Sequence, residues 1–332
     1  MKTLKRTWAD ISLDNLEYNY RSIRAHLPQG TKFLGVMKAD AYGHGAVPVS
    51  RALADLGAEY LAVSNLEEAV QIRRGEVRLP ILILGYTPAE YAANMIFLDI
   101  TQEVHSLEYA RELNEALAGT NYILNVHLKL DTGMTRIGFF AYDNERTLDE
   151  LRQVAQLPHL HIEGAFMHFC VADSRAEADV SFTKLQYKRF MDMLSAMAGV
   201  GIRPEIRHCC NSGATILYPE FALDMVRPGI ITYGNAPSDE LEGALSLRPM
   251  MSLHSMIAQV RTVPAGTDIS YGRLYRTKEE TRVAVLPIGY ADGLSRLLTG
   301  KASFYLQGHQ VPVIGRICMD MCMIDVSNVP EA

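Results

Sequence analysis

Short apolar runs alternate with amphipathic stretches through the first two thirds of the chain. The runs have the length and aliphatic content typical of buried strands of a parallel sheet. They cover residues 33–36, 60–63, 80–84, 95–100 (the weakest of the set), 125–130, 162–169, 206–210 and 224–226. Two further stretches have one apolar face at helical spacing: Leu107, Ala110, Leu113 and Leu117 in the first, and Phe182, Leu185, Phe190, Met193, Leu194 and Met197 in the second.

Helix start and stop signals separate several of these runs. The pattern predicts a helix over residues 47–56 that ends at Gly57. It also predicts a second helix, which begins with a capping box formed by Ser64 and Glu67 and ends before Gly75. The strand–helix alternation recurs about eight times over roughly 230 residues, which is typical of parallel β/α units. A closed (β/α)8 barrel fits that number better than an open sheet, although the pattern alone leaves a doubly wound sheet open.

The pattern of apolar runs and helical stretches changes after residue 235. Residues 236–243 are rich in Pro, Ser, Asp, Glu and Gly, and no helix of usual length is predicted beyond them. Short strand-like runs follow at residues 252–263, 282–288, 302–306, 311–314 and 322–326. We therefore expect two domains, a barrel over residues 1–235 and a mainly β domain over residues 236–332.

Composition narrows the class of protein. The chain has 332 residues, 48% hydrophobic and 21% charged, which excludes a disordered chain and a coiled coil. A net charge of −6 and a pI near 5.9 argue against nucleic acid or an anionic membrane as partner. The start of the chain has no apolar segment like that of a signal peptide, and no aliphatic block is long enough to span a bilayer. We read the five cysteines as reduced thiols of a cytoplasmic protein and expect no metal.

The first candidate for chemistry is Lys38, which directly follows an apolar strand. Active sites of barrels lie at the carboxyl ends of the strands, and a lysine there can form a Schiff base with a carbonyl cofactor. A solvated lysine at a strand end is the ordinary alternative. The dense A-Y-G-H-G sequence that follows at residues 41–45 favours the functional interpretation.

The block V-M-K-A-D-A-Y-G-H-G at residues 36–45 resembles the cofactor-lysine motif of alanine racemases, pyridoxal-phosphate enzymes built from a barrel and a β domain. Five more blocks match that family in the same order. They are H-L-K-L-D-T-G-M-T-R-I-G at 127–138, M-V-R-P-G-I at 225–230 followed by Tyr233-Gly234, S-Y-G at 270–272, G-Y-A-D-G at 289–293 and G-R-I-C-M-D at 315–320.

The resemblance implies two catalytic residues. Lys38 would bind pyridoxal 5'-phosphate covalently and act as a base on one face of the substrate Cα, and Tyr271 would act on the opposite face. Racemisation requires removal of a proton from one side and delivery to the other. Because an ordinary tyrosine is a poor base, its phenolate needs support, which the resemblance assigns to His168. Taken alone, His168 is more often a core histidine.

The resemblance also implies a cofactor site. Arg227 would face the pyridine nitrogen and, since arginine does not give up its proton, would leave that nitrogen unprotonated. Such a ring is a weaker electron sink, which would suppress transamination. The phosphate would be bound by the residues Tyr42, Asn211, Ser212, Gly229 and Ile230. Alone, the N-S-G sequence at 211–213 is equally typical of a turn or a helix cap.

For the substrate, the resemblance implies that Arg136 binds the carboxylate, with the backbone N–H of Met319 beside it. Lys129 is a position of possible carbamylation. Since Tyr271 and Met319 belong to the second domain, the resemblance implies a head-to-tail homodimer with composite active sites, interconverting L- and D-alanine and supplying D-alanine for peptidoglycan. Family members usually continue for several dozen residues beyond the last residue here, so we expect a β domain that is incomplete relative to the family.

Other interpretations share parts of this pattern. A serine or broad-specificity racemase would carry the same motifs, because one hydroxyl is weakly discriminated by an apolar pocket. A decarboxylase of this fold would be expected to place an acid where Arg227 stands, and a non-catalytic pyridoxal-phosphate carrier would need only the barrel. A zinc site at His208, Cys209 and Cys210 is disfavoured, because adjacent cysteines are poorly placed to bind one ion.

Overall fold

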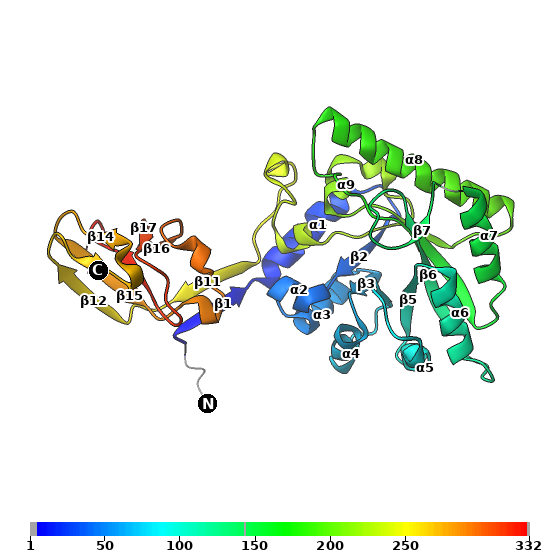
Figure 1. Ribbon diagram of the computed structural model, residues 1–332, viewed down its shortest axis with the longest axis horizontal. Coiled ribbons are helices and arrows are strands. Elements are labelled where there is room, and N and C mark those ends of the chain that lie inside the picture. Colours follow the sequence, from blue (N-terminus) through cyan, green and yellow to red (C-terminus); the bar gives the residue numbers. More distant parts are fainter. Residues whose placement is uncertain (1–4, 143, 331–332) are drawn as a thin grey trace. The chain divides into compact units, whose positions relative to one another are not determined.

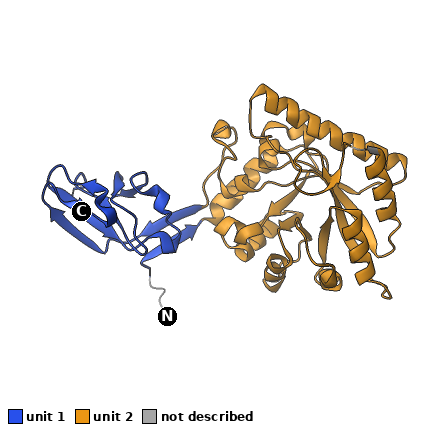
Figure 2. Cartoon of the chain, in the orientation of Figure 1, with its two compact units in different colours: residues 1–11, 251–332 blue, residues 12–250 orange. Residues whose placement is uncertain are grey.

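The computed structural model describes residues 5–142 and 144–330, which form two compact units (Figure 1, Figure 2). One unit comprises residues 12–250, and the other combines residues 1–11 with residues 251–332. The sequence places the change of domain near residue 235. Residues 236–250 belong to the larger unit, and their last part contacts helix α1 (Leu13–His26): Asn19 exchanges hydrogen bonds with the backbone of Arg248, and Ser22 donates to the carbonyl of Ser246.

The larger unit is a parallel, nearly closed eight-stranded barrel, which confirms the predicted fold class. Its strands, which pair in chain order, are β2 (Lys32–Val36), β3 (Tyr60–Val63), β4 (Ile81–Ile83), β5 (Ile100–Val104), β6 (Leu124–Asp131), β8 (Leu160–Phe166), β9 (Ile206–His208) and β10 (Met225–Val226). β10 pairs with β2, and on its other side Asp224 and Arg227 donate backbone hydrogen bonds to Arg207 and Cys210. A short strand, β7 (Phe139–Phe140), extends the pairing of β6.

Helices lie on the outside of these strands (Figure 1). After α1 they are α3 (Ala46–Leu56), α4 (Leu66–Arg74), α5 (Ala92–Phe97), α6 (Leu107–Ala116), α7 (Asn144–Ala155), α8 (Glu177–Gly199) and α9 (Ser212–Leu217). The element α2 (Lys38–Gly43) directly follows β2 and is a left-handed turn. Because helices cover the outside and side chains fill the inside, all four residues of β3 are buried. No helix in the described ranges is both long enough and apolar enough to cross a membrane.

The smaller unit is built from antiparallel strands. They are β1 (Thr7–Ile11), β11 (Met251–Ser255), β12 (Gln259–Val263), β13 (Asp268–Ile269), β14 (Tyr275–Arg276), β15 (Thr281–Leu286), β16 (Ser303–Leu306), β17 (His309–Ile314) and β18 (Cys322–Asp325). β12, β15, β18, β17 and β16 form one sheet in that order, and β1 pairs with β11. The run predicted over 252–263 is therefore two strands, and each belongs to a different sheet.

Three local predictions are wrong. Residues 95–97 end helix α5, and Asp99, with φ of 53°, turns the chain into β5, so the run at 95–100 is not a strand. The N-cap of α4 is Asn65, whose side chain accepts from the N–H of Glu68, so the cap lies one residue beyond Ser64. In α8 the predicted apolar face includes Leu185, which is exposed.

Candidate active site

The chain leaves β2 in a left-handed turn, α2, that begins at Lys38. The four residues from Ala39 to Tyr42 have φ of 52° to 56°. Left-handed backbone costs about 1–2 kcal/mol per residue for side chains with a Cβ, so neighbouring groups must hold it. His44 Nδ1 lies 3.0 Å from the carbonyl oxygens of both Ala41 and Tyr42, and Glu68 accepts a hydrogen bond from the N–H of Ala39. The A-Y-G-H-G sequence thus builds the turn that presents Lys38.

A small polar cradle lies beside this turn. The N–H of Gly229 donates to Ser212 Oγ at 2.9 Å, and a Cβ on Gly229 would lie 2.8 Å from Tyr42 Oη. Only glycine at position 229 leaves the space beside the Tyr42 hydroxyl open. Burial raises the pKa of Tyr42, so its hydroxyl keeps its proton and can donate a hydrogen bond. Asn211 caps α9 by accepting from the N–H of Ala214, so the capping interpretation of the N-S-G sequence is correct for that residue. Together these groups offer donors of the kind a phosphate needs.

Arg227 follows β10 and is only 4% exposed. Its Nη1 donates to His208 Nδ1 at 2.9 Å, and its Nη2 donates to the carbonyl oxygens of Met167 and Cys209 at 2.7 and 3.1 Å. Within residues 5–142 and 144–330, Nε has no hydrogen-bond partner. Burial lowers the pKa of Arg227 to about 10, which still leaves it a cation at neutral pH. Of the five N–H donors of the guanidinium, Nε–H and one Nη1–H therefore remain, and Nε–H is the one whose nitrogen makes no other bond.

The loop after β6 is ordered by the side chain of Asp131, at the end of that strand. Asp131 Oδ1 accepts hydrogen bonds from the N–H groups of residues 133, 134 and 135, all at 3.0 Å, which fixes the segment leading to Arg136. A Cβ on Gly138 would lie 2.7 Å from the carbonyl oxygen of Lys129, so the loop returns too closely for any other residue. Lys129 itself is 4% exposed, and burial together with Arg227 lowers its pKa to about 7.

All the barrel residues predicted for the site line a single cavity of about 610 Å³. They are Lys38, Tyr42, Lys129, Arg136, His168, Asn211, Ser212, Arg227, Gly229 and Ile230. Burial and the nearby Arg227 lower the pKa of His168 well below its usual range, so that side chain is neutral. With two arginines and two lysines in its wall, the cavity suits a ligand that carries a phosphate and a carboxylate.

Tyr271 and Met319 belong to the other unit, where they are 70% and 53% exposed. The predicted motifs of this unit pack on one another. Ser270 Oγ donates to the carbonyl of Arg316 at 2.6 Å, and the N–H of Ala291 donates to the carbonyl of Met319 at 3.0 Å. The structure therefore gathers the S-Y-G, G-Y-A-D-G and G-R-I-C-M-D sequences around one turn, with the tyrosine side chain open to solvent.

Sequence reasoning missed the polar partners behind these residues. Glu68 gives no signal, because its role depends on α4 lying beside the lysine turn. The sequence suggests His208 only as a zinc ligand, whereas in the structure its two ring nitrogens bond Arg227 and His127. Across the described part of the chain, no three His, Cys, Asp or Glu side chains are grouped as a metal site would require. The five cysteines are free thiols.

Comparison with known proteins agrees with this geometry. Residues 11–237 match the model of the alanine racemase N-terminal domain, and residues 250–332 match that of the C-terminal domain. The alanine racemase of Desulfovibrio desulfuricans is 46% identical over 325 residues, covering 98% of this chain and 86% of the relative. That of Clostridium tetani is 43% identical, covering 99% of this chain and 84% of the relative.

Solved structures agree as well. Alanine racemase from Clostridium difficile 630 superposes with a TM-score of 0.93 at 39% identity, covering 100% of this chain and 85% of that one. The Bacillus anthracis enzyme with bound L-Ala-P superposes with a TM-score of 0.88 at 34% identity, covering 98% of this chain and 83% of that one. The chain therefore belongs to the alanine racemase family of pyridoxal-phosphate-dependent isomerases.

Proposed function

We propose that this chain interconverts L- and D-alanine in the barrel cavity, with Lys38 acting on one face of the substrate Cα and Tyr271 of the partner subunit on the other. One observation carries the proposal. The cavity brings together a lysine on a constrained turn, a buried arginine with an unused Nε donor, and a cradle that only glycine permits. These three features meet the needs of pyridoxal phosphate at its aldehyde, ring nitrogen and phosphate.

The residues present fit that cofactor. Bound there, pyridoxal phosphate supplies a conjugated ring that withdraws electrons from Cα. Lys38 would hold it covalently, and Tyr42, Ser212 and the N–H groups of Gly229 and Ile230 would bind the phosphate beside Asn211. Arg227 would face the ring nitrogen with its Nε donor and would not give up the proton, which would disfavour transamination.

The substrate carboxylate is bound by Arg136, whose planar fork matches a carboxylate. Met319 adds a backbone N–H from the other unit of a partner chain. Carbamylated Lys129 positions Arg136, because a carbamate beside a guanidinium replaces repulsion between two cations by attraction. His168 bonds the phenolic oxygen of Tyr271 and supports its work as a base.

A homodimer follows from the same assignment. Tyr271 is 70% exposed on its own unit, whereas a tyrosine acting as a base needs a site that excludes water. A head-to-tail dimer covers this tyrosine and completes two sites at once. We place the enzyme in the cytoplasm, where its D-alanine product serves peptidoglycan synthesis. Serine or broader specificity is the alternative, and the relatives named alanine racemase favour alanine.

The test separates the two faces of the reaction. Tyr271→Ala is expected to lower turnover in both directions by about 10²–10⁴-fold, the usual contribution of one positioned acid or base. It should still exchange the Cα proton of one enantiomer, D-alanine, in heavy water through Lys38. Tyr305→Ala, at an exposed tyrosine of the same unit, is the matched control and should keep full activity.

Mixing inactive Lys38→Ala and Tyr271→Ala chains tests the dimer, since one site of each mixed dimer keeps both bases. Recovered activity supports the composite site. Equal exchange of both enantiomers by Tyr271→Ala would refute the two-base assignment, and well-formed mixed dimers that stay inactive would refute the contribution across subunits. L-serine assayed beside L-alanine decides the specificity.

A further inference from the structure

A chain of hydrogen bonds crosses the barrel interior from Arg227 to Glu163. Arg227 Nη1 lies 2.9 Å from His208 Nδ1, His208 Nε2 lies 2.9 Å from His127 Nδ1, and His127 Nε2 lies 3.0 Å from Glu163 Oε2. Both imidazoles are completely buried. Four neighbouring segments of the barrel, at β10, β9, β6 and β8, thus contribute one residue each to a continuous polar path.

The direction of this path is fixed by its first member. Arginine only donates, so His208 Nδ1 accepts and His208 carries its proton on Nε2. His127 Nδ1 must then accept, which leaves the proton of His127 on Nε2, where it is donated to the carboxylate. Burial lowers the pKa of both imidazoles and keeps them neutral. Partial burial raises the pKa of Glu163, but hydrogen bonds from His127 and Tyr60 outweigh this and bring it to about 2.

The backbone around Glu163 is arranged for this contact. Val126 pairs with Ile162 but His127 pairs with Gly164, so Glu163 is the extra residue of a β-bulge. Bulges re-aim side chains, and here the carboxylate is aimed at the imidazole of the facing strand. A Cβ on Gly164 would lie 2.5 Å from a ring carbon of His127, so glycine makes room for the ring.

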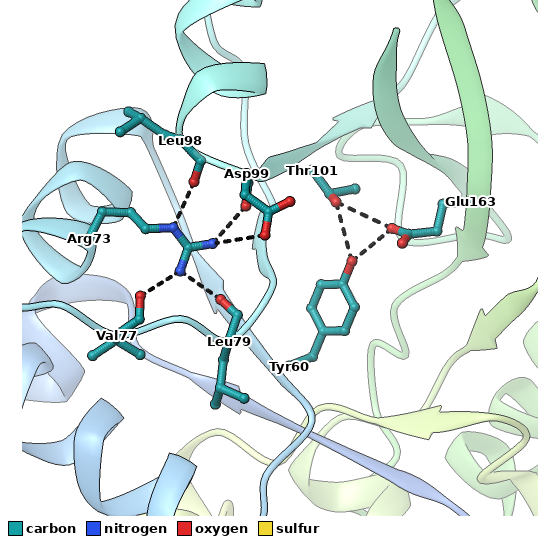
Figure 3. Close-up of polar contacts among 8 residues, drawn as sticks. All are labelled: Tyr60, Arg73, Val77, Leu79, Leu98, Asp99, Thr101 and Glu163. Carbon is teal, nitrogen blue, oxygen red and sulfur yellow. Dashed lines mark hydrogen bonds and ion pairs between the residues drawn. The ribbon is translucent and has the colours of Figure 1, made fainter.

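Two further donors hold the same carboxylate. Tyr60 Oη and Thr101 Oγ1 lie 2.7 and 3.2 Å from Glu163 Oε2, and Figure 3 shows both hydroxyls directed at it. The side chain of Glu163 is 18% exposed, so the path ends near solvent at the amino-terminal end of β3 and β5. Close by, Arg73 binds carbonyl oxygens of Val77, Leu79, Leu98 and Asp99 and ties this end of the barrel together (Figure 3).

We propose that Glu163 is a positioning residue for racemisation, acting through His127 and His208 to fix the orientation of Arg227 and to balance its buried charge. The inference rests on the proposed role of Arg227 toward the cofactor. A buried cation without a counter-charge is costly, and the anion at the far end of two neutral imidazoles supplies one while leaving Nε of Arg227 free. A fixed guanidinium would keep its Nε donor directed toward the place of the ring nitrogen.

The experiment compares Glu163→Gln with Glu59→Gln. Glu59 also accepts hydrogen bonds, from Arg24 and the N–H of Phe33, but lies off the path, so its variant is the matched control. For Glu163→Gln we expect turnover to fall about 10-fold to 100-fold, by analogy with the loss when the outer hydrogen-bond partner of a metal-ligating histidine is removed. KM for alanine should stay unchanged, because Arg136 is not on the path. Side transamination per turnover should rise.

A second readout does not depend on activity. In protein labelled with ¹⁵N-histidine, long-range proton–nitrogen spectra distinguish the two tautomers. Both His127 and His208 should carry the proton on Nε2 in the parent and in Glu59→Gln, and both signals should shift in Glu163→Gln. If Glu163→Gln folds poorly, Gly164→Ala displaces the ring of His127 with Glu163 intact and should give the same kinetic signature.

The possible failures are distinguishable. The positioning role of Glu163 is overturned if Glu163→Gln and Gly164→Ala both leave the tautomer signals and the rate of transamination unchanged. This conclusion holds even when Arg227→Lys loses activity. If Arg227→Lys also retains full activity and its cofactor spectrum, the proposed role of Arg227 itself fails. Partial rescue of turnover by Glu163→Asp, which restores the charge on a shorter side chain, supports the charge-balancing part.

Discussion

Lys129 carries an ionisable amine in a wall that already holds two guanidinium groups. Burial and the neighbouring Arg227 lower its pKa to about 7 from 10.5. At pH 7 about half of this amine is neutral, whereas an ordinary lysine is neutral in only about one molecule in 3,000. Only the neutral amine reacts with carbon dioxide, so the reactive fraction is raised about 1,500-fold.

Reaction of Lys129 with carbon dioxide forms an N–C bond and releases one amine proton to solvent. The product is a carbamate, whose negative charge is favoured by Arg136 and Arg227, the same cations that disfavour the ammonium form. We therefore expect about one carbamate per chain at pH 8 in ¹³C-bicarbonate, seen as one carbonyl resonance by ¹³C NMR. Occupancy should fall as the pH drops below about 7, because the amine becomes protonated.

Lys129→Gln should lack the resonance, and Lys188→Gln, which changes an exposed lysine on α8, should keep it. Removing bicarbonate should lower kcat/KM for alanine in the parent but not in Lys129→Gln. The electrostatic reasoning is refuted if the parent shows no carbamate at pH 8, or if the resonance persists in Lys129→Gln.

Three other outcomes are expected. Lys38→Ala should abolish racemisation in both directions, and borohydride should no longer fix the cofactor to the chain by mass spectrometry; cofactor fixed at another lysine would contradict the assignment. Arg227→Glu should raise side transamination, measured as pyruvate, because a carboxyl group lets the ring nitrogen keep a proton; unchanged side products would place Arg227 elsewhere. The native structure lowers the pKa values of three buried histidines, His127, His168 and His208. Below pH 6.5 the unfolded chain therefore binds protons that the native chain does not. The free energy of unfolding should fall there by about 1.4 kcal/mol per pH unit for each histidine. Urea unfolding at pH 7.5 and 5.5 measures this, and equal stabilities would refute it.

The sequence predicts the barrel well because a strand covered on both faces must be continuously apolar, as β3 is. It fails at 95–100, where apolar residues of a short helix run into the next strand and only the left-handed Asp99 marks the boundary. That the site residues of the barrel share one cavity could be predicted because most of them lie in sequence blocks that resemble those of a known family. The position of Glu163 could not be predicted, because a β-bulge exists only in the register between two strands and leaves no mark in either strand alone.

The pairing of β1 with β11 sets the order in which this chain can be assembled. Thr7 lies opposite Ser255 and Ile11 opposite Met251. During synthesis, β1 therefore cannot pair with β11 until the whole barrel has been made. The barrel thus lies in the chain between two paired strands of the smaller unit, and its own ends are joined by the hydrogen bond from the N–H of Ser12 to the carbonyl of Met250. A tight turn from Ile11 to Met251 would close a hairpin in the existing register, giving the β unit as a separate chain with its tyrosine turn intact.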